Sequence, residues 1–332
     1  MKWNLNLTLK PGNIMQLFHN KENQLTPIER VSFKLEKNIQ DLVEANIETI
    51  FDYQFVSSEL SIEEFRLDTL AFDKQNNSFV IIEYKKGHSY SVVDQGYSYL
   101  SIMLNNKAEF ILEYNEKNKE TLKRSDVDWS SSKVIFIAPS FNAYQKNSIN
   151  FKDVPFELWE IKQFEKGLIS FEQYLASSSE SIQKISKGDN GSVISKVSSE
   201  IKSTSEEDHI NNLNDTLKLV WKTLKEKLDS YSDTSFSVSK SYVSWKKNNK
   251  AVSFIHFRNN EFRIDISRGM INQNKTKSKG FFTLDDPKKL GTEGNWTWKN
   301  GGTGHSYKIA LKNENDLDYV MYLLEQKYNS IV

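Results

Sequence analysis

Two short runs of consecutive apolar residues constrain the fold of this chain more than any other feature. Residues 79–82 read Phe-Val-Ile-Ile, and residues 134–138 read Val-Ile-Phe-Ile-Ala. Runs of this length, rich in β-branched residues, are typical of strands that are buried on both faces. Such strands occur in sheets that helices cover, so the chain is predicted to contain an α/β domain.

The remaining pattern predicts the elements around these strands. They are a helix over about 27–50, a strand over 51–56, a hairpin of strands 65–72 and 79–85, a helix over 91–104, and strands over 133–138 and 156–161. The first helix is expected because Thr26 can cap it, Pro27 suits its first turn and Glu29 completes a capping box. The polar segment 73–78 has the composition of a turn. Together these elements predict a mixed sheet flanked by helices.

The domain organisation follows from length and from a change in composition. The chain has 332 residues, enough for two domains of ordinary size. The α/β domain is expected to occupy residues 1–175. Serines cluster in residues 176–204, a composition typical of a linker. Residues 205–332 are predicted to form a second, α+β domain that begins with an apolar helical face between Leu213 and Leu228.

Composition excludes several classes of site. The chain has no cysteine, and its 44 basic residues balance 44 acidic ones. Without cysteine there are no disulfides, thiolate zinc sites or cysteine nucleophiles. Residues 1–6 lack the apolar run of a signal peptide, and no apolar stretch approaches the ~20 residues of a membrane span. The expectation is a cytoplasmic protein that does not act on a membrane.

Asp68, Glu83 and Lys85 are the candidate catalytic residues. Glu83 and Lys85 end the second hairpin strand, and a spacing of two puts them on one face. The turn at 73–78 brings Asp68 across from Glu83, provided that the register does not slip by one residue. Two carboxylates can hold Mg²⁺ or Mn²⁺, which acidifies water and neutralises charge on a phosphate. Lys85 would stabilise the developing negative charge. The set predicts phosphodiester hydrolysis.

This arrangement resembles the PD-(D/E)xK nuclease superfamily, with Leu67 in place of the proline of the motif. Two further features carry the resemblance. Glu36, expected on the first helix, resembles the helical acidic residue that often supplies another metal contact in these enzymes. Gln95 and Tyr99, four apart on the second helix, resemble the Q-x-x-x-Y motif of the branch related to the exonuclease RecB.

The resemblance covers about residues 25–175, and the order of elements is also similar to that of archaeal mismatch-type endonucleases. It implies a restriction-endonuclease-like fold and a Mg²⁺- or Mn²⁺-dependent endonuclease that acts on DNA. It also implies metal ligation by Asp68, Glu83 and Glu36, with Gln95 as an orienting residue. Nucleases that cut both strands are often dimers, so a homodimer is compatible with it. The alternative is a nucleic-acid-binding or protein-interaction protein that keeps the fold without the chemistry.

A basic segment lies in the predicted second domain. Between Lys240 and Lys279, ten Lys or Arg oppose two acidic residues, and aromatic residues are interleaved among them. Basic side chains bind phosphates and aromatic rings stack on bases. The segment is therefore predicted to bind nucleic acid, with contacts from Lys246, Lys247, Lys250, Arg258, Arg263 and Arg268. The alternative is a set of amphipathic strands with charged outer faces.

The second domain also resembles a domain of unknown function. That domain is found at the C-terminus of nuclease-like and restriction-associated proteins and is sometimes labelled a predicted transport protein. The residues that carry the resemblance are the Glu-Glu-Asp-His opening at 206–209, Asp285-Asp286-Pro287, Gly302-Thr303-Gly304 and Asp316-Leu317-Asp318-Tyr319. The resemblance implies co-occurrence with nucleases and no known chemistry.

Overall fold

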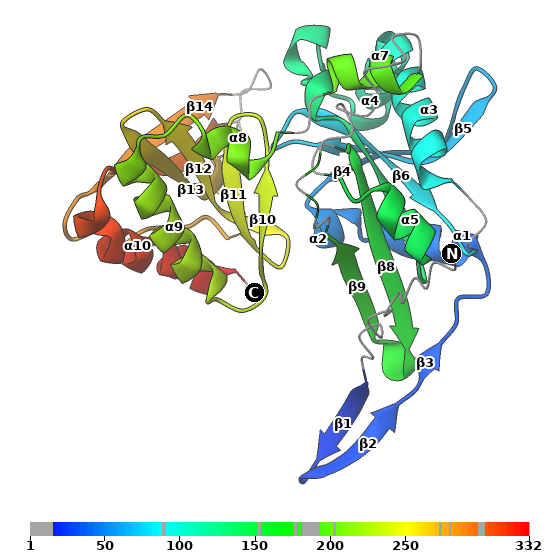
Figure 1. Ribbon diagram of the computed structural model, residues 1–332, viewed down its shortest axis with the longest axis horizontal. Helices are drawn as coiled ribbons and strands as arrows, with labels where there is room; N and C mark the ends of the chain where they lie inside the picture. The colour runs from blue at the N-terminus through cyan, green and yellow to red at the C-terminus, as the bar shows by residue number, and fades with distance from the viewer. Residues whose placement is uncertain are drawn as a thin grey trace, which may run out of the picture.

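Two sheets, each with its own apolar core, organise the chain (Figure 1). The computed structural model describes residues 16–87, 91–151, 154–175, 178, 180, 193–201, 204–271, 274–278, 280–297 and 303–331. The first sheet has seven strands and is mixed, and the second has six strands. The predicted α/β class, with a mixed sheet flanked by helices and a second α+β unit, is confirmed.

The first sheet places the two apolar runs at its centre. Its strands are β3 (Arg30–Val31), β4 (Gln54–Ile62), β5 (Phe65–Asp73), β6 (Ser78–Tyr84), β7 (Lys133–Ala138), β8 (Phe156–Phe164) and β9 (Ile169–Tyr174). The order is β3-β8-β7-β6-β5-β4, and β9 pairs with β8. Strands β4, β5 and β6 are antiparallel, whereas β6, β7 and β8 are parallel. Every residue of β6 is buried.

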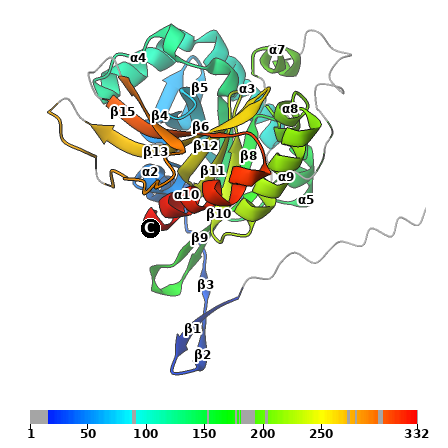
Figure 2. The same ribbon diagram turned by 90° about the vertical axis from the view of Figure 1, so that its left-hand side faces the viewer.

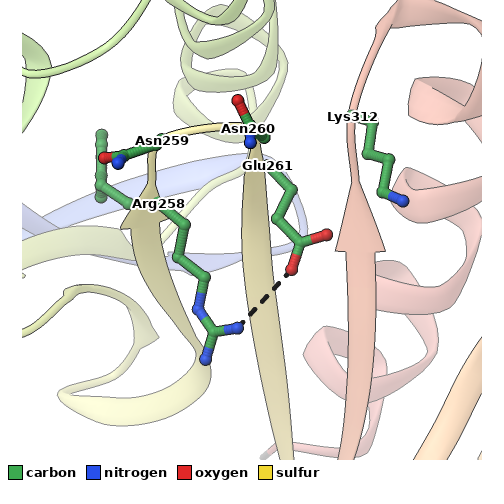
Figure 3. Close-up of a pocket in the computed structure, with 6 residues that line it drawn as sticks. Arg258, Asn259, Asn260, Glu261 and Lys312 are labelled. Atoms are coloured by element: carbon green, nitrogen blue, oxygen red, sulfur yellow. Dashed lines mark ion pairs between the residues drawn. The ribbon is translucent and has the colours of Figure 1, made fainter.

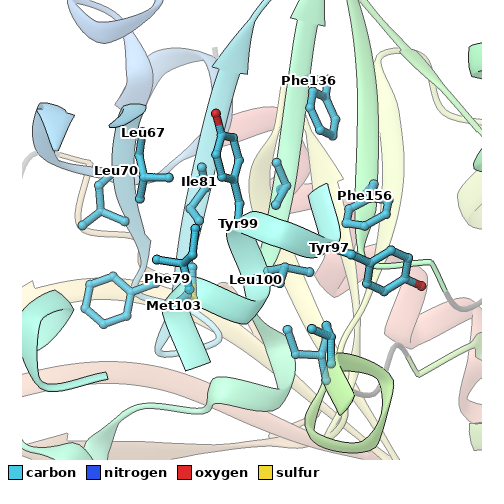
Figure 4. Packing of buried hydrophobic residues seen from close by; sticks show 14 of the residues in the cluster. Leu67, Leu70, Phe79, Ile81, Tyr97, Tyr99, Leu100, Met103, Phe136 and Phe156 are labelled. Carbon is cyan, nitrogen blue, oxygen red and sulfur yellow. The ribbon is translucent and has the colours of Figure 1, made fainter. Parts of the chain in front are cut away.

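Helices cover both faces of this sheet, as strands apolar on both faces require. One face packs against α1 (Glu36–Glu44) and α2 (Ile47–Phe51). The other face packs against α3 (Val92–Asn105) and α4 (Lys107–Asn118), and α5 (Ala143–Ser148) lies against α3. Figure 4 shows how Tyr97, Leu100 and Met103 of α3 lie among side chains of β5, β6, β7 and β8. In the described part of the chain, no helix is long and apolar enough to cross a membrane.

The predicted first helix begins nine residues too early. Residues 24–28 form β2 (Gln24–Ile28), which pairs with β1 (Leu17–Lys21) in a hairpin that projects from the body (Figure 2). Its turn is made by Glu22 and Asn23, both with left-handed backbone angles, which Asn tolerates better than most residues. Pro27 therefore lies in a strand, and the capping box is wrong. Buried helical spacing starts only at Ile39.

The predicted linker contains a helix. Helix α7 (Val193–Glu200) lies against α3, and Val197 and Ile201 are buried in the core of the first sheet. An ion pair of 2.6 Å between Lys107 and Glu200 joins α7 to α4. Most of the serine cluster between 176 and 192 lies outside the described residues, so its role as a linker stays a prediction.

The second sheet is antiparallel and is covered by helices on one face. Its strands are β10 (Thr234–Val238), β11 (Val243–Lys247), β12 (Lys250–Arg258), β13 (Glu261–Ile271), β14 (Gly291–Thr297) and β15 (Thr303–Leu311), in the order β10-β11-β12-β13-β15-β14. Helices α9 (Asp215–Asp229) and α10 (Leu317–Ser330) bury their apolar faces on it, and the short α8 (Glu206–Ile210) precedes them. Gly302 lies outside the described residues, whereas Thr303 and Gly304 begin β15.

The two halves meet at the turn between β5 and β6. The Tyr242 hydroxyl donates a hydrogen bond to the carbonyl of Gln75 at 3.0 Å and approaches the Asn76 side-chain oxygen at 3.1 Å. The side-chain amide of Asn249 donates to the carbonyl of Ile50 at 2.5 Å. The C-terminal half therefore contacts the end of the β5–β6 hairpin that lies away from Asp68.

Gly96 sets how closely α3 approaches the sheet. A Cβ on Gly96 would lie 2.5 Å from the Phe156 ring, which is held edge-on by Tyr97 and Phe136. We expect Gly96→Ala to lower the free energy of unfolding by about 1–3 kcal/mol through overpacking, despite a helix-propensity gain of about 1 kcal/mol. Urea unfolding measures this.

The matched control for this substitution is Gly87→Ala, because a Cβ there meets no atom within 4 Å. It should leave the unfolding midpoint nearly unchanged. A Gly96→Ala protein more stable than wild type would show that the Phe156 ring is free to move.

Candidate functional site

Asp68 and Glu83 face each other across the β5–β6 ladder. The ladder pairs Thr69 with Ile82, so the next pair in register is Asp68 and Glu83. By strand alternation with Leu70, Asp68 projects to the face that α3 covers. One Asp68 carboxylate oxygen accepts a hydrogen bond of 3.0 Å from the backbone N–H of Tyr84. The register has not slipped, so the two carboxylates share one face of the sheet.

Lys85 completes the group. Its ammonium lies 2.6 Å from a carboxylate oxygen of Glu83, and both side chains are nearly buried, at 12% and 4% exposed. At this burial the ion pair is screened little by water. The backbone N–H of Lys85 donates to the carbonyl of Ile137 at 2.9 Å, which extends the parallel pairing with β7 by one residue and fixes where Lys85 leaves the sheet.

Gln95 and Tyr99 approach the same carboxylate from α3. Ser91 caps this helix by accepting a hydrogen bond from the Asp94 backbone at 3.3 Å. The Gln95 amide donates to the Glu83 oxygen that Lys85 contacts, at 2.8 Å, and to the Tyr99 hydroxyl at 2.8 Å. Burial and the neighbouring Glu83 carboxylate raise the pKa of Tyr99, so its hydroxyl stays protonated. The structure thus brings Asp68, Glu83, Lys85 and Gln95 together.

The two carboxylates fit a cation. The second carboxylate oxygen of Glu83 is buried and has no hydrogen-bond partner, an arrangement that costs free energy unless a cation or donor meets it. Burial and Glu83 raise the pKa of the Asp68 carboxyl to about 6. Mg²⁺ is commonly held by one or two carboxylates together with substrate phosphates. Among the described residues, no three acidic or histidine side chains converge as a ready-made cage.

Glu36 lies beside this group, at the first turn of α1. One of its carboxylate oxygens accepts a hydrogen bond of 2.6 Å from the backbone N–H of Lys86, the residue after Lys85. Glu36 therefore holds the chain just past Lys85. Its role as a metal ligand stays a prediction.

Three polar residues near the site were not predicted. Gln40 and Glu44 follow Glu36 on α1 at helical spacing, and both contact the Asp68 end of β5. Glu59 lies across from Asp68 on β4, since the ladder pairs Ser58 with Thr69 and Leu60 with Leu67. The sequence signal for Gln40 and Glu44 is a polar stripe at every fourth residue of one helix face, although it does not identify their partners.

Of the six basic residues predicted to bind nucleic acid, Lys246 faces the first sheet. Burial lowers the pKa of Lys246, and the Asp73 and Asp52 carboxylates of the first half act against this. Burial likewise raises the pKa of Asp52 to about 6. Lys246 is therefore half-buried between the halves, as a counter-charge to two aspartates.

Lys247, Arg263 and Arg268 have partners within the C-terminal half. The Lys247 ammonium donates to the Ile331 carbonyl at 2.6 Å, at the end of α10. Arg263 lies 3.1 Å from a carboxylate oxygen of Asp265. Arg268 pairs with Glu293 at 2.8 Å. Nucleic-acid binding by these side chains stays a prediction, and it requires a phosphate to compete with these contacts.

Arg258 and Lys250 are more open. Arg258 lines an open pocket of about 720 Å³ at the turn between β12 and β13, and its guanidinium lies 3.6 Å from Glu261 (Figure 3). Asn259, Asn260, Phe257 and Lys312 complete the lining. Lys250 is exposed at the start of β12. This pocket lies in the C-terminal half and contains none of the Asp68 group.

Known proteins resemble this chain to different extents. No model of a known protein family matches it. A protein of Haemophilus influenzae, described only as uncharacterized, is 39% identical over 319 residues, which are 94% of this chain and 99% of that protein. The chain belongs to the family of that protein.

Two solved structures resemble part of the chain. A complex of EndoMS with double-stranded DNA is 19% identical with a TM-score of 0.26, over 36% of this chain and 43% of that chain. A repair endonuclease from Pyrococcus abyssi is 18% identical with a TM-score of 0.22, over 36% of this chain and 45% of that chain. The chain thus spans less than half the length of either neighbour. The fold class is therefore assigned from the sheet and its helices rather than from these two structures.

The raised pKa of Asp68 predicts a pH-dependent effect on stability. Because this pKa rises from 3.8 to about 6 on folding, the folded chain binds more protons than the unfolded chain between about pH 4 and 6. The carboxylate therefore lowers the free energy of unfolding progressively as pH rises through this window. Asp68→Asn keeps an oxygen for the Tyr84 N–H and should raise the melting temperature at pH 7.5 by roughly 2 °C or more.

The same substitution should have little effect at pH 4, where the wild-type carboxyl is largely protonated. Thermal melts at both pH values, without added divalent cations, measure the difference. An Asp68→Asn protein destabilised equally at both pH values would contradict a charge-based cost at this position.

Proposed function

We propose that this chain is a metal-dependent nuclease that hydrolyses phosphodiester bonds, with DNA as its substrate class. The observation that carries the proposal is the meeting of Asp68, Glu83 and Lys85 at one end of β6, with Glu83 also held by Gln95. Strand β6 is buried along its length, yet it ends in an ion pair beside a carboxylate oxygen that has no hydrogen-bond partner. Buried charges in such surroundings are typical of functional sites rather than of packing.

Each residue has a distinct role in this proposal. Asp68 and Glu83 would hold Mg²⁺ or Mn²⁺, and Glu36 is a candidate for a third contact. When bound, such an ion supplies Lewis acidity at the phosphate and makes an attacking water more acidic. Lys85 would stabilise the negative charge that develops on the phosphate. Gln95 would keep the Glu83 carboxylate from rotating, because it donates to the same oxygen as Lys85.

The choice of DNA follows from the resemblance of these residues to the PD-(D/E)xK motif. The Asp68, Glu83 and Lys85 pattern matches that motif, and the Gln95 to Tyr99 spacing matches its RecB-related branch. A protein that binds nucleic acid without cutting it is the competing function. Such a protein would bind nucleic acid without divalent cations and would not cleave it when they are added. One cleavage assay with and without Mg²⁺ or Mn²⁺ therefore separates the two functions.

Lys85→Met tests the catalytic role of the ammonium while keeping an unbranched side chain. We expect cleavage of plasmid and linear DNA to fall at least about 100-fold, because the ammonium acts on charge that develops in the transition state. The dissociation constant for DNA should change little, since ground-state binding is retained. Gel assays of nicking and fluorescence anisotropy measure the two quantities.

The matched control is Lys74→Met, on the turn of the same hairpin, where the lysine is 57% exposed and 3.6 Å from Glu120. It should cleave like wild type. Equal losses of binding and cleavage in Lys85→Met would make Lys85 a phosphate anchor. A wild-type chain that binds DNA and cuts neither DNA nor RNA with either metal would contradict the nuclease function and support the nucleic-acid-binding function.

Lys250 tests nucleic-acid binding by the C-terminal half. Each lysine that contacts a phosphate contributes about −0.9 to the slope of log affinity against log salt for duplex DNA. We expect Lys250→Ala to reduce the magnitude of this slope by about one and to weaken binding to all sequences alike. Lys246→Ala should instead lower the melting temperature, because Lys246 faces Asp52 and Asp73. An unchanged slope in Lys250→Ala would remove this side chain from the interface.

A further inference from the structure

Helix α1 presents a polar stripe to the candidate site. Glu36, Gln40 and Glu44 recur every fourth residue, so they lie along one side of the helix. Ile39 and Val43 fix α1 to the sheet through apolar contacts, and both are fully buried. Gln40 is also buried, with 4% of its surface exposed. A buried amide lowers stability unless its hydrogen-bonding groups are satisfied, so the partners of Gln40 indicate what the stripe does.

Gln40 holds the backbone of Asp68. Its amide nitrogen lies 3.0 Å from the Asp68 carbonyl oxygen, 2.9 Å from a Glu44 carboxylate oxygen and 3.1 Å from the Ser58 hydroxyl. On β4, the residue across from Asp68 is Glu59, whose backbone has a left-handed φ of 55°. A helix side chain thus braces the Asp68 carbonyl where the neighbouring strand is irregular.

Glu44 holds the next residue of β5. The Thr69 hydroxyl donates to the Glu44 carboxylate at 2.5 Å and lies 3.1 Å from the Tyr84 hydroxyl. Because the single hydroxyl proton of Thr69 goes to Glu44, Tyr84 is the donor to Thr69. The backbone N–H of the same Tyr84 donates to the Asp68 carboxylate at 3.0 Å. The chain of contacts therefore returns from Glu44 to the Asp68 side chain.

We propose that Gln40 and Glu44 are positioning residues that set the Asp68 carboxylate against Glu83 for cation binding. The proposal rests on the nuclease function proposed above. Gln40 fixes the Asp68 backbone from one side of the sheet, and Glu44, through Thr69 and Tyr84, fixes the donor that orients the carboxylate. Functional groups need placement within about 0.5 Å, which their supporting hydrogen bonds supply. Loss of such supports typically weakens metal affinity about 10- to 100-fold.

A purely structural role for the stripe makes a different prediction. If Gln40 served only to attach α1, replacing it with an apolar side chain of similar length would change stability without changing cation affinity. The chain offers a matched control in Gln54, a half-buried glutamine on β4 whose amide donates to Asn118 and whose oxygen accepts from Tyr114 of α4. Gln54 also links a strand to a helix, but it contacts no residue of the candidate site.

The experiment measures Mn²⁺ binding to the full-length chain by calorimetry, alongside melting temperature. We expect Gln40→Met and Thr69→Val to raise the dissociation constant for Mn²⁺ about 10- to 100-fold. Thr69→Ser, which keeps the hydroxyl, should stay near wild type. Gln54→Met should bind Mn²⁺ like wild type even where its melting temperature falls as far as that of Gln40→Met.

The outcomes separate this inference from the nuclease function. Wild-type affinity in both Gln40→Met and Thr69→Val, with lowered melting temperatures, would overturn the positioning role and leave the function standing. Mn²⁺ binding by the wild type that Asp68→Asn does not weaken would overturn both. Affinity lost in Thr69→Val and retained in Thr69→Ser supports the role of the hydroxyl, because valine has nearly the shape of threonine without its hydroxyl, whereas serine keeps the hydroxyl.

Discussion

Glu83 and Lys85 form an ion pair at the end of a strand whose residues are all buried. Strand β6 is buried along its whole length, with β5 and β7 on either side and helices on both faces. In such surroundings a carboxylate is retained only where a cation or hydrogen-bond donors compensate for its lost hydration. Lys85 and Gln95 meet one oxygen of Glu83. Much of the surrounding structure can be understood as support for this one charge.

Sequence patterns predicted the parts of the fold that apolar burial controls. Strands β6 and β7, the hairpin and α3 were all expected, because continuous or periodic apolar residues leave few ways to be buried. Residues 27–35 were wrongly predicted as helix from the local capping pattern at Thr26, because buried residues at helical spacing begin only at Ile39. Helix α4 and strand β9 were missed, since neither has a strong apolar pattern of its own.

The residues of the candidate site could be predicted from the sequence, whereas the residues that hold them in place could not be predicted as well. Glu83 and Lys85 stand out because they interrupt an apolar run, and the hairpin brings Asp68 opposite. Gln40 and Glu44 form a polar stripe that the sequence shows, but their partners on the strands lie 18 to 28 residues away and include a backbone atom, so the stripe does not reveal what it supports. The basic segment shows the opposite difficulty. Its local charge is high, but Lys246 and Arg268 meet carboxylates from distant parts of the chain.

The turn between β5 and β6 connects contacts of the C-terminal half with the register of the candidate site. Asp73 accepts hydrogen bonds from the backbone of Gln75 and Asn76, and Tyr242 closes over the same two residues. A hairpin keeps its alternation only while its turn keeps its length, and a shift of one residue would move Asp68 to the opposite face. The Tyr242 contacts of the C-terminal half therefore support the turn on whose length the alignment of Asp68 with Glu83 depends.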